Sequence, residues 1–352
     1  MALSSSIPTA TTSRLCATAD ERAARSAGSK GALIALVRWL ACVVAICAAS
    51  PTWAAWPERP VRLIVAAPAG SSIDALAREI AERLKDRIGQ PVVVDNKAAA
   101  GGTVATAEVA KAAPDGYTLL LGFNGPLAFA PLLTKVRYGV AKDFAPVVIA
   151  SSQPNVLAVN AELPARSVRE LVALAKANPG KLAYASVGQG SASHLDMELF
   201  KSVAGFDALH VPFNGSPPAV MATMQNETQM LFAVMQPLKA QIDAGRLRAL
   251  AVTSAKRFAL LPDLPTIAES GYPGFVALAW NGVMAPSATP KPIIARLNAE
   301  INAIFNKADV TAKMNAVGFE LIGGTPEALG ELIARETATW APVVRKLGIR
   351  AD

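Results

Sequence analysis

The sequence contains very little histidine and cysteine. Its 352 residues include two histidines, His194 and His210, and three cysteines, all before residue 50. Zinc and iron–sulfur centres need clusters of these residues, and disulfide scaffolds need cysteines that can pair. We therefore expect no metal site, no cofactor and no disulfide framework.

Charged residues are also scarce, at 17%, whereas hydrophobic residues make up 52%. This composition excludes intrinsic disorder, and the length fits two α/β lobes. The formal net charge is +7, from 34 Lys+Arg against 27 Asp+Glu, and the basic residues are spread along the chain. Without a basic run, we expect no nucleic acid and no anionic membrane surface as a partner.

An export signal is predicted for residues 1–54. Five basic residues lie before an 11-residue apolar run, residues 39–49, which is followed by small residues at Thr52 and Ala54. This order is typical of a secretory signal peptide, and we place cleavage near Ala54, which puts the mature chain in the periplasm. The alternative is a membrane anchor, but a spanning helix needs about 20 apolar residues. Cleavage leaves 29 basic and 25 acidic residues and no cysteine.

Short apolar runs alternate with helical patterns along the rest of the chain. Apolar residues from Ile73 to Ile88 recur at helical spacing, and Gly89 ends the pattern. Two apolar runs between residues 146 and 159 are separated at 151–154. Further strands are expected at 61–67, 91–94, 117–122, 184–187, 209–212, 231–235 and 248–253, and further helices at 103–112, 167–178, 194–204, 217–224, 291–305 and 326–347. The alternation predicts an α/β fold with mainly parallel sheets.

Motifs of catalysis are missing. The stretch Gly188-Gln189-Gly190 lacks the third glycine of a dinucleotide-binding loop, and the chain has neither a phosphate-loop lysine nor a G-x-S-x-G motif. His210 lies in an apolar run and is interpreted as a core or wall residue. His194, at a helix start, fits either a structural hydrogen bond or a ligand site. With no serine and histidine in a motif that would place them as nucleophile and base, we expect no enzyme, and an exported α/β hydrolase is the catalytic alternative.

Small or hydroxyl-bearing residues follow five predicted strands, just before a helix begins. They occupy residues 69–72, 101–103, 124–125, 186–193 and 214–216. The first N–H groups of a helix are unpaired and carry partial positive charge, and small residues let an anion approach them. Such loops line the crevice at the carboxyl ends of strands in open α/β sheets. The pattern predicts a cradle for a carboxylated ligand.

Several longer segments point to a known family. They include residues 56–65 (WPERPVRLIV), 68–74 (PAGSSID), 89–97 (GQPVVVDNK), 112–120 (AAPDGYTLL), 184–188 (YASVG), 245–252 (GRLRALAV) and 261–266 (LPDLPT). Through them the chain resembles the Bug/TctC family, the extracytoplasmic solute receptors of tripartite tricarboxylate transporters.

The resemblance implies a type II-like periplasmic-binding-protein fold with two α/β lobes and a hinge. Lobe 1 would contain residues 55–154 and 254–352, and lobe 2 residues 155–253. It implies a monomer that binds a small organic acid between the lobes and delivers it to the membrane subunits of a transporter. A ligand-sensing module that docks on a membrane sensor kinase is the alternative, because it needs the same cleft.

Loop pattern and resemblance together predict the ligand-binding residues. They are Ala69, Gly70, Ser71, Ser72, Asp74, Asn124, Gly125, Ser186, Gly188, Gly190, Ser191, His194 and Asn214.

The chain departs from the family pattern at several places, including Gln225-Asn226-Glu227-Thr228-Gln229 for a Gly-Gly-Gln-Val-Asp stretch and Phe213-Asn214-Gly215 for an aromatic-Lys-Gly. Ser71-Ser72 replaces consecutive glycines, Asp196-Met197 replaces Ala-Gly, and Ala233 replaces an acidic residue found in many members. The last departure disfavours a ligand whose amine needs a carboxylate partner.

Overall fold

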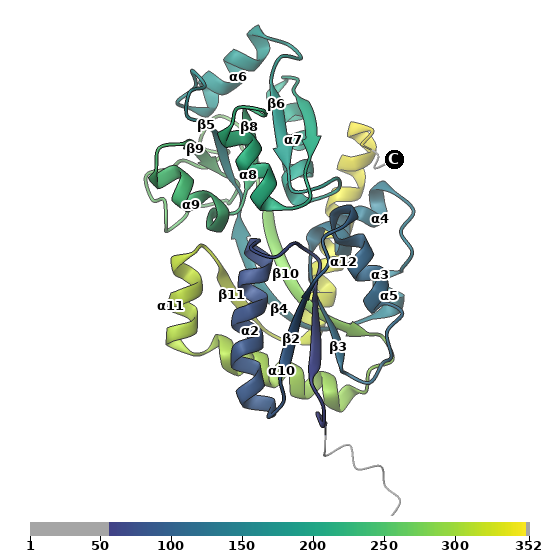
Figure 1. Cartoon of the computed structure of the whole chain (residues 1–352). Helices are drawn as coiled ribbons and strands as arrows, with labels where there is room; N and C mark the ends of the chain where they lie inside the picture. The colour runs from purple at the N-terminus through teal and green to yellow at the C-terminus, as the bar shows by residue number, and fades with distance from the viewer. Residues whose placement is uncertain (1–55, 350–352) are drawn as a thin grey trace, which may run out of the picture. The chain divides into compact units, whose positions relative to one another are not determined.

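Two β-sheets, each with helices on both faces, organise the computed structural model, which describes residues 56–349 (Figure 1). Contacts group the chain from Pro57 onward into one compact unit. The predicted export signal, residues 1–54, lies outside the described residues.

The six-stranded sheet has the order β11-β4-β10-β3-β1-β2, and the five-stranded sheet has the order β7-β6-β8-β5-β9. The strands of the first sheet are β1 (Val61–Val65), β2 (Val92–Asn96), β3 (Thr118–Phe123), β4 (Phe144–Pro154), β10 (Leu278–Pro286) and β11 (Glu320–Gly323). Those of the second are β5 (Val156–Asn160), β6 (Ala183–Ser186), β7 (Leu209–Pro212), β8 (Met230–Ala233) and β9 (Leu247–Val252).

Helices cover both faces of the six-stranded sheet (Figure 1). On one face α2 (Ser72–Ile88) packs against α10 (Lys291–Phe305), and α11 (Ala308–Ala316) adjoins α10 and β11. The other face carries α3 (Thr103–Val109), η3 (Gly125–Phe129), α4 (Ala130–Leu133) and α12 (Pro326–Leu347). The short elements η2 (Ala100–Gly102) and α5 (Val140–Asp143) precede α3 and β4.

Helices also lie on both faces of the five-stranded sheet. One face carries α6 (Val168–Ala177) and α7 (Ala192–Ala204), and the other carries α8 (Ser216–Met224) and α9 (Met235–Asp243). The α/β fold class predicted from the alternating pattern is confirmed.

The predicted parallel character of the sheets needs a correction. Among the strand pairs of the described residues, four are parallel and five antiparallel, so both sheets are mixed. Helical crossovers account for the parallel pairs. The antiparallel pairs arise where the chain passes between the sheets, because β4 runs toward the second sheet and β10 returns from it.

The predicted break at residues 151–154 is also wrong. The strand β4 continues to Pro154, and Asn155 alone separates it from β5. Prediction also omitted β10, β11, α9 and α11.

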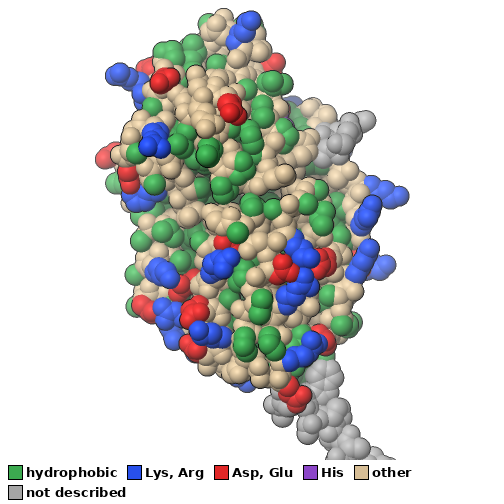
Figure 2. Space-filling view, in the orientation of Figure 1, with side chains coloured by type: hydrophobic (Ala, Val, Ile, Leu, Met, Phe, Trp, Pro, Cys, Tyr) green, Lys and Arg blue, Asp and Glu red, His purple; other side chains and the backbone are tan. Residues whose placement is uncertain are grey.

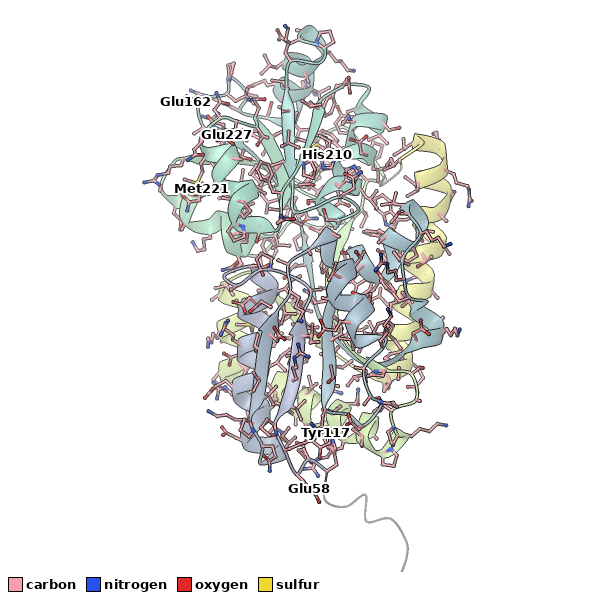
Figure 3. The ribbon with its side chains drawn as sticks, turned by 45° about the vertical axis from the view of Figure 1, so that its right-hand side comes forward. Glu58, Tyr117, Glu162, His210, Met221 and Glu227 are labelled. Carbon is pink, nitrogen blue, oxygen red and sulfur yellow. The ribbon has the colours of Figure 1, made fainter. Side chains whose placement is uncertain are left out.

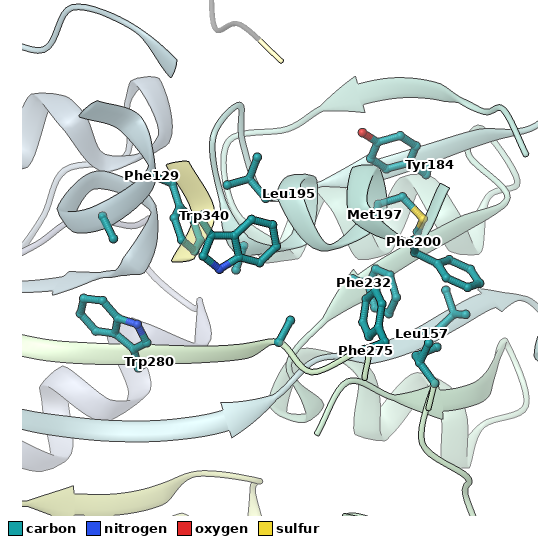
Figure 4. Close-up of a cluster of buried hydrophobic side chains, with 14 of the residues drawn as sticks. Phe129, Leu157, Tyr184, Leu195, Met197, Phe200, Phe232, Phe275, Trp280 and Trp340 are labelled. Carbon is teal, nitrogen blue, oxygen red and sulfur yellow. The ribbon is translucent and has the colours of Figure 1, made fainter. Parts of the chain in front are cut away.

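One apolar cluster extends from the six-stranded sheet into the five-stranded one (Figure 4). At one end Phe129 packs on Trp340, with ring centroids 5.3 Å apart. At the other end Phe200 packs edge-on against Phe232 and Phe275. Burying each large side chain contributes about 1.5–3 kcal/mol, so this shared core holds α7 and α12 against each other.

The charged surface carries both signs. On the face in Figure 2, Lys and Arg side chains are interspersed with Asp and Glu, without a patch of one sign. No helix within residues 56–349 has both the length and the apolar character needed to cross a bilayer.

Candidate ligand-binding site

A cavity lies where the strand ends of the two sheets face each other. Its empty volume is about 770 Å³, which includes solvent at its mouth. The six-stranded sheet contributes the ends of β1, β3 and β4, the start of β10 and the loops before α2 and α3. The five-stranded sheet contributes the residues after β6, β7 and β8.

The described wall contains no Asp, Glu, Lys, Arg or His side chain. Its polar side chains are Ser71, Ser72, Asn124, Gln153, Asn155, Ser193, Asn214, Ser216 and Asn281. Two of these hold buried atoms without a hydrogen-bond partner, Gln153 Oε1 and Ser216 Oγ. Because a buried polar atom without a partner costs free energy, the wall is suited to a polar occupant.

The first turn of α2 forms one side of the cavity. Ser71 is the N-cap, and its Oγ accepts a hydrogen bond from the Asp74 N–H. The Asp74 side chain turns back, and its Oδ2 accepts from the Gly70 N–H at 2.9 Å and from Arg78 Nε at 3.0 Å. Burial alone would raise the pKa of Asp74, but Arg78 and the Gly70 N–H outweigh it and hold that pKa below its usual value. Asp74 therefore fixes the loop and does not line the cavity.

The first turn of α7 forms the opposite side and repeats this construction. Ser191 is the N-cap, and its Oγ accepts from the His194 N–H. His194 Nδ1 accepts from the Gly190 N–H at 3.1 Å. The buried His194 ring stacks on His210 with centroids 4.0 Å apart.

His210, labelled on β7 in Figure 3, continues this stack and does not line the cavity. Its ring also stacks on Tyr184, and its Nε2 lies 2.7 Å from Ser186 Oγ. Burial, with a smaller effect of Lys201, lowers the pKa of His194 to about 4. Burial and the neighbouring His194 lower the pKa of His210 to about 3. Both rings are therefore neutral at pH 7.

Loops from the two sheets touch at the rim of the cavity. Gly215, with φ of +103°, lies so close to Pro68 that an added Cβ would stand 2.7 Å from Pro68 Cδ. A Cβ on Gly101 would stand 2.7 Å from the carbonyl oxygen of Gln189. Only glycine permits approaches this close.

The two sheets are connected at one side of the cavity. Asn155 lies between β4 and β5, and Thr253 follows β9. The Asn155 N–H donates to Thr253 Oγ1, and the Thr253 N–H donates to the Asn155 carbonyl oxygen, both at 2.9 Å. The two crossing segments are thus tied together next to the cavity.

The thirteen predicted ligand-binding residues fall into two groups. Ser71, Ser72, Asn124 and Asn214 line the cavity. The residues outside its wall are Ala69, Gly70, Asp74, Gly125, Ser186, Gly188, Gly190, Ser191 and His194. Gly70, Asp74, Ser191 and His194 instead hold the two helix starts, and Gly188 and Gly190 line a second hollow beside α3 and α4.

The wall residues that prediction missed include Gln153, Asn155, Trp280 and Asn281. The polar stretch at residues 151–154 inside an apolar region is the available signal, but the pattern alone favours a break between two strands there. Trp280 and Asn281 lie on β10, which was not predicted. No group of His, Cys, Asp and Glu in residues 56–349 is arranged to hold a metal ion.

Comparison with known proteins identifies close relatives. Residues 76–349 match the family described as "Tripartite tricarboxylate transporter family receptor". Protein BugT of Bordetella pertussis is 40% identical over 297 residues, which are 84% of this chain and 91% of BugT.

Two solved structures from Rhodopseudomonas palustris are also similar. A protein solved with adipate has 37% identity and a TM-score of 0.81, with 84% of this chain and 99% of that chain covered. MatC, solved with bound malate, has 31% identity and a TM-score of 0.79, with 82% and 100% covered.

Proposed function

We propose, from the premise that the chain belongs to the tripartite tricarboxylate transporter receptor family, that it captures a small organic carboxylate in this cavity. Family membership makes it a periplasmic solute-binding protein. Delivery of the acid to the membrane subunits of a transporter is part of the proposal, as is export through a signal peptide cleaved near Ala54. The adipate and malate bound by two relatives support the carboxylate class.

The observation that carries this proposal is the pair of helix starts, α2 and α7, that face the cavity from the two sheets. Ser72 and Ile73 begin α2 at the wall, and Ala192 and Ser193 begin α7 there. Unpaired N–H groups and the partial positive charge of a helix start attract an anion. Since no acidic side chain lines the cavity, its described wall holds no negative charge to repel a carboxylate or to pair with an ammonium group.

The two helix starts suit a ligand with polar groups at both ends. The N-terminus of α8 also reaches the wall at Ser216, but Pro217 and Pro218 follow and have no N–H. Gln153 Oε1 needs a donor, and the Ser216 hydroxyl can donate or accept; a ligand hydroxyl or bridging waters would satisfy both.

We further propose that the two sheets are the cores of two lobes, residues 55–154 with 254–352 and residues 155–253, which close on the ligand. Rim contacts of Gly215 with Pro68 and of Gly101 with Gln189 support a closed arrangement. The segments at Asn155 and Thr253 would act as the hinge. A ligand that contacts both lobes favours closure by its differential affinity.

The contact between Ser186 and His210 is the one observation that favours a hydrolase. Ser186 Oγ lies 2.7 Å from His210 Nε2, a distance at which histidine can act as a base toward serine. Ser186 is, however, fully buried and lines neither hollow, so a substrate does not reach its hydroxyl. The contact is better explained as support for the loop between β6 and α7, because Ser186 Oγ also bonds Gly188.

A thermal-shift screen of the mature chain tests the proposal. Mono-, di- and tricarboxylates, aromatic acids, neutral sugars and amines would be added separately, since a ligand that binds the native state raises Tm by mass action. We expect at least one acid to raise Tm. A shift with sugars or amines and none with any acid would contradict carboxylate binding.

A further inference from the structure

Behind the cavity wall lies a carboxyl group that the proposed function does not use. Asp196, on α7, is 1% exposed. Its Oδ2 accepts a hydrogen bond of 2.7 Å from Asn155 Nδ2, and no cationic side chain of residues 56–349 forms an ion pair with it. A buried, unpaired carboxylate is costly, so this carboxyl is favoured in its protonated form.

Asn155 connects Asp196 to the cavity. It lines the cavity wall, and its main chain is tied to Thr253 at the crossing between the two sheets. Because Asn155 Nδ2 gives one of its two N–H groups to Asp196, the other N–H and the amide oxygen Oδ1 are left for a ligand. The carboxyl of Asp196 therefore fixes which face of this amide meets the cavity.

The elements packed against α7 supply few charges to Asp196. The residues of β8 are apolar, and on β6 Tyr184 donates its hydroxyl to Glu198. From α12, the charge of Glu336 works to raise the pKa of Asp196, and the charge of the exposed Arg335 works to lower the pKa of Glu336.

On α7 itself, Lys201 bonds Glu198, and His194 is neutral. Burial and the charge of Glu336 outweigh the Asn155 amide and raise the pKa of Asp196 to about 8, and burial raises the pKa of Glu336 too.

We propose that Asp196 is a positioning residue that holds Asn155 at the cavity wall and retains or takes up a proton when an anionic ligand binds. This inference rests on the proposed function, because it requires an anion in the cavity. A bound carboxylate next to Asn155 disfavours the ionised form of Asp196 by repulsion in a poorly screened site. Binding of the acid and of the proton therefore reinforce each other to the same extent.

The linkage has a definite direction. Below pH 7 Asp196 is already protonated and the affinity for the acid is at its highest. Above pH 8 the proton must be taken up on binding, so Kd rises, by up to about tenfold per pH unit. Dicarboxylic acids are fully ionised above pH 7, and both histidines are neutral there, so neither contributes to the change.

Isothermal titration calorimetry from pH 6 to 9 tests the inference, with adipate as the probe and malate if adipate does not bind. Asp196→Asn keeps an acceptor for Asn155 Nδ2 and has no proton to lose. We expect its Kd to stay flat to pH 9, near the wild-type value at pH 7, whereas the wild-type Kd rises at least fivefold between pH 7 and 9. Asp243→Asn, at an exposed acid on α9, is the matched control and should follow the wild type.

Proton counting separates the outcomes further. In buffers of different ionisation enthalpy at pH 8.5, the wild type should take up a fraction of a proton per ligand and the Asp196→Asn variant none. Identical pH profiles for the two proteins would overturn the inference and leave the proposed function standing. If neither acid binds at any pH, the proposed function fails, and this inference with it.

Glu336→Gln keeps the inference testable if Asp196→Asn does not fold. Removing that charge lowers the pKa of Asp196, so the rise in Kd should begin at a lower pH than in the wild type. An unchanged profile in this variant would contradict the role of Asp196.

Discussion

The starts of α2 and α7 face each other across the cavity and are built alike, yet differ in one side chain. Each has a serine N-cap, and three residues later a side chain that accepts the N–H of the glycine before that serine. In α2 this side chain is the charged Asp74, and in α7 it is the neutral His194. The positive end of α2 is thus partly neutralised, whereas that of α7 remains available to an anion.

The same local hydrogen-bond arrangement therefore serves two electrostatic purposes. Asp74, with its Arg78 partner, gives the first loop stability that persists in acid. His194 gives the second loop the same geometry without a negative charge, but only while its ring is unprotonated. Substitutions at the two helix starts and at the rim between them test this contrast.

Removing the Asp74 side chain and removing the His194 side chain should lower the free energy of unfolding by unequal amounts. Asp74→Ala deprives Gly70 and Arg78 of a charged acceptor and should lower the free energy of unfolding by about 3 kcal/mol. His194→Ala removes a neutral acceptor and a stacked ring, and about 2 kcal/mol is expected. Urea unfolding at pH 7 measures both, with Asp86→Ala, an exposed acid on α2, as a near-neutral control. A larger loss for His194→Ala would contradict the ranking.

Acid should weaken the α7 start before the α2 start. His194 has a folded pKa of about 4, below the unfolded value of about 6.5. Its stabilising contribution is complete above pH 6.5 and is lost as the pH falls toward 4, on the order of 3 kcal/mol in all. Asp74, whose pKa is lowered, keeps its contribution until the pH falls below about 4.

His194→Asn isolates this effect, because Asn keeps an acceptor and does not titrate. The pH-dependent contribution of Asp196, which has the opposite sign between pH 4 and 8, cancels in the difference between the two proteins. The unfolding free energy of the variant relative to the wild type should rise as the pH falls from 6.5 to 4. A difference that stays constant would show that His194 is not neutral in the folded state.

One methyl group added at Gly215 should break the contact between the two sides of the rim. Gly215→Ala places a Cβ against the Pro68 ring and should raise the Kd for a bound acid at least tenfold, about 1.4 kcal/mol. Gly70→Ala is the matched control, because φ is +76° there but a Cβ meets no atom within 4 Å. Calorimetry should give the control a Kd within about threefold of the wild type, since it adds backbone strain only. Equal effects would mean that closure does not need the Gly215 contact.

The smallest difference in stability is expected between variants of the two serine N-caps, Ser71 and Ser191. Ser71→Ala loses one cap bond and should lower stability by about 1 kcal/mol. Ser191→Ala should cost slightly more, because Ser191 Oγ also donates to the Gly188 carbonyl oxygen at 2.6 Å. Thermal unfolding of both variants tests this order, and a lower Tm for Ser71→Ala than for Ser191→Ala would reverse it.

Local patterns in the sequence were sufficient for the fold class and for most helices. The helical pattern from Ile73 to Ile88, for example, ends at Gly89, and Gly89 is the C-cap of α2. The strand β10 was missed because its place depends on pairing with β3 and β4, which lie more than 120 residues earlier in the chain. The division into two lobes stays a prediction.

Only part of the cavity was predicted, again because some of its residues are placed by contacts between distant parts of the chain. Ser71 and Asn214 lie in loops whose composition marks them, whereas Gln153 and Asn155 lie where the chain crosses between sheets. Asp74 and His194 carried a recognisable signal, a glycine and serine followed three residues later by an acceptor. That signal indicates a side chain that supports the loop rather than one that touches the ligand.

The most direct test of carboxylate capture is a crystal structure of the mature chain with the acid that raises Tm most. We predict a carboxylate group on the N–H groups at the start of α7, with the far end of the ligand at the start of α2 and no cationic side chain in contact with it. A ligand bound outside this cavity, or a carboxylate held by a lysine or arginine, would contradict the account.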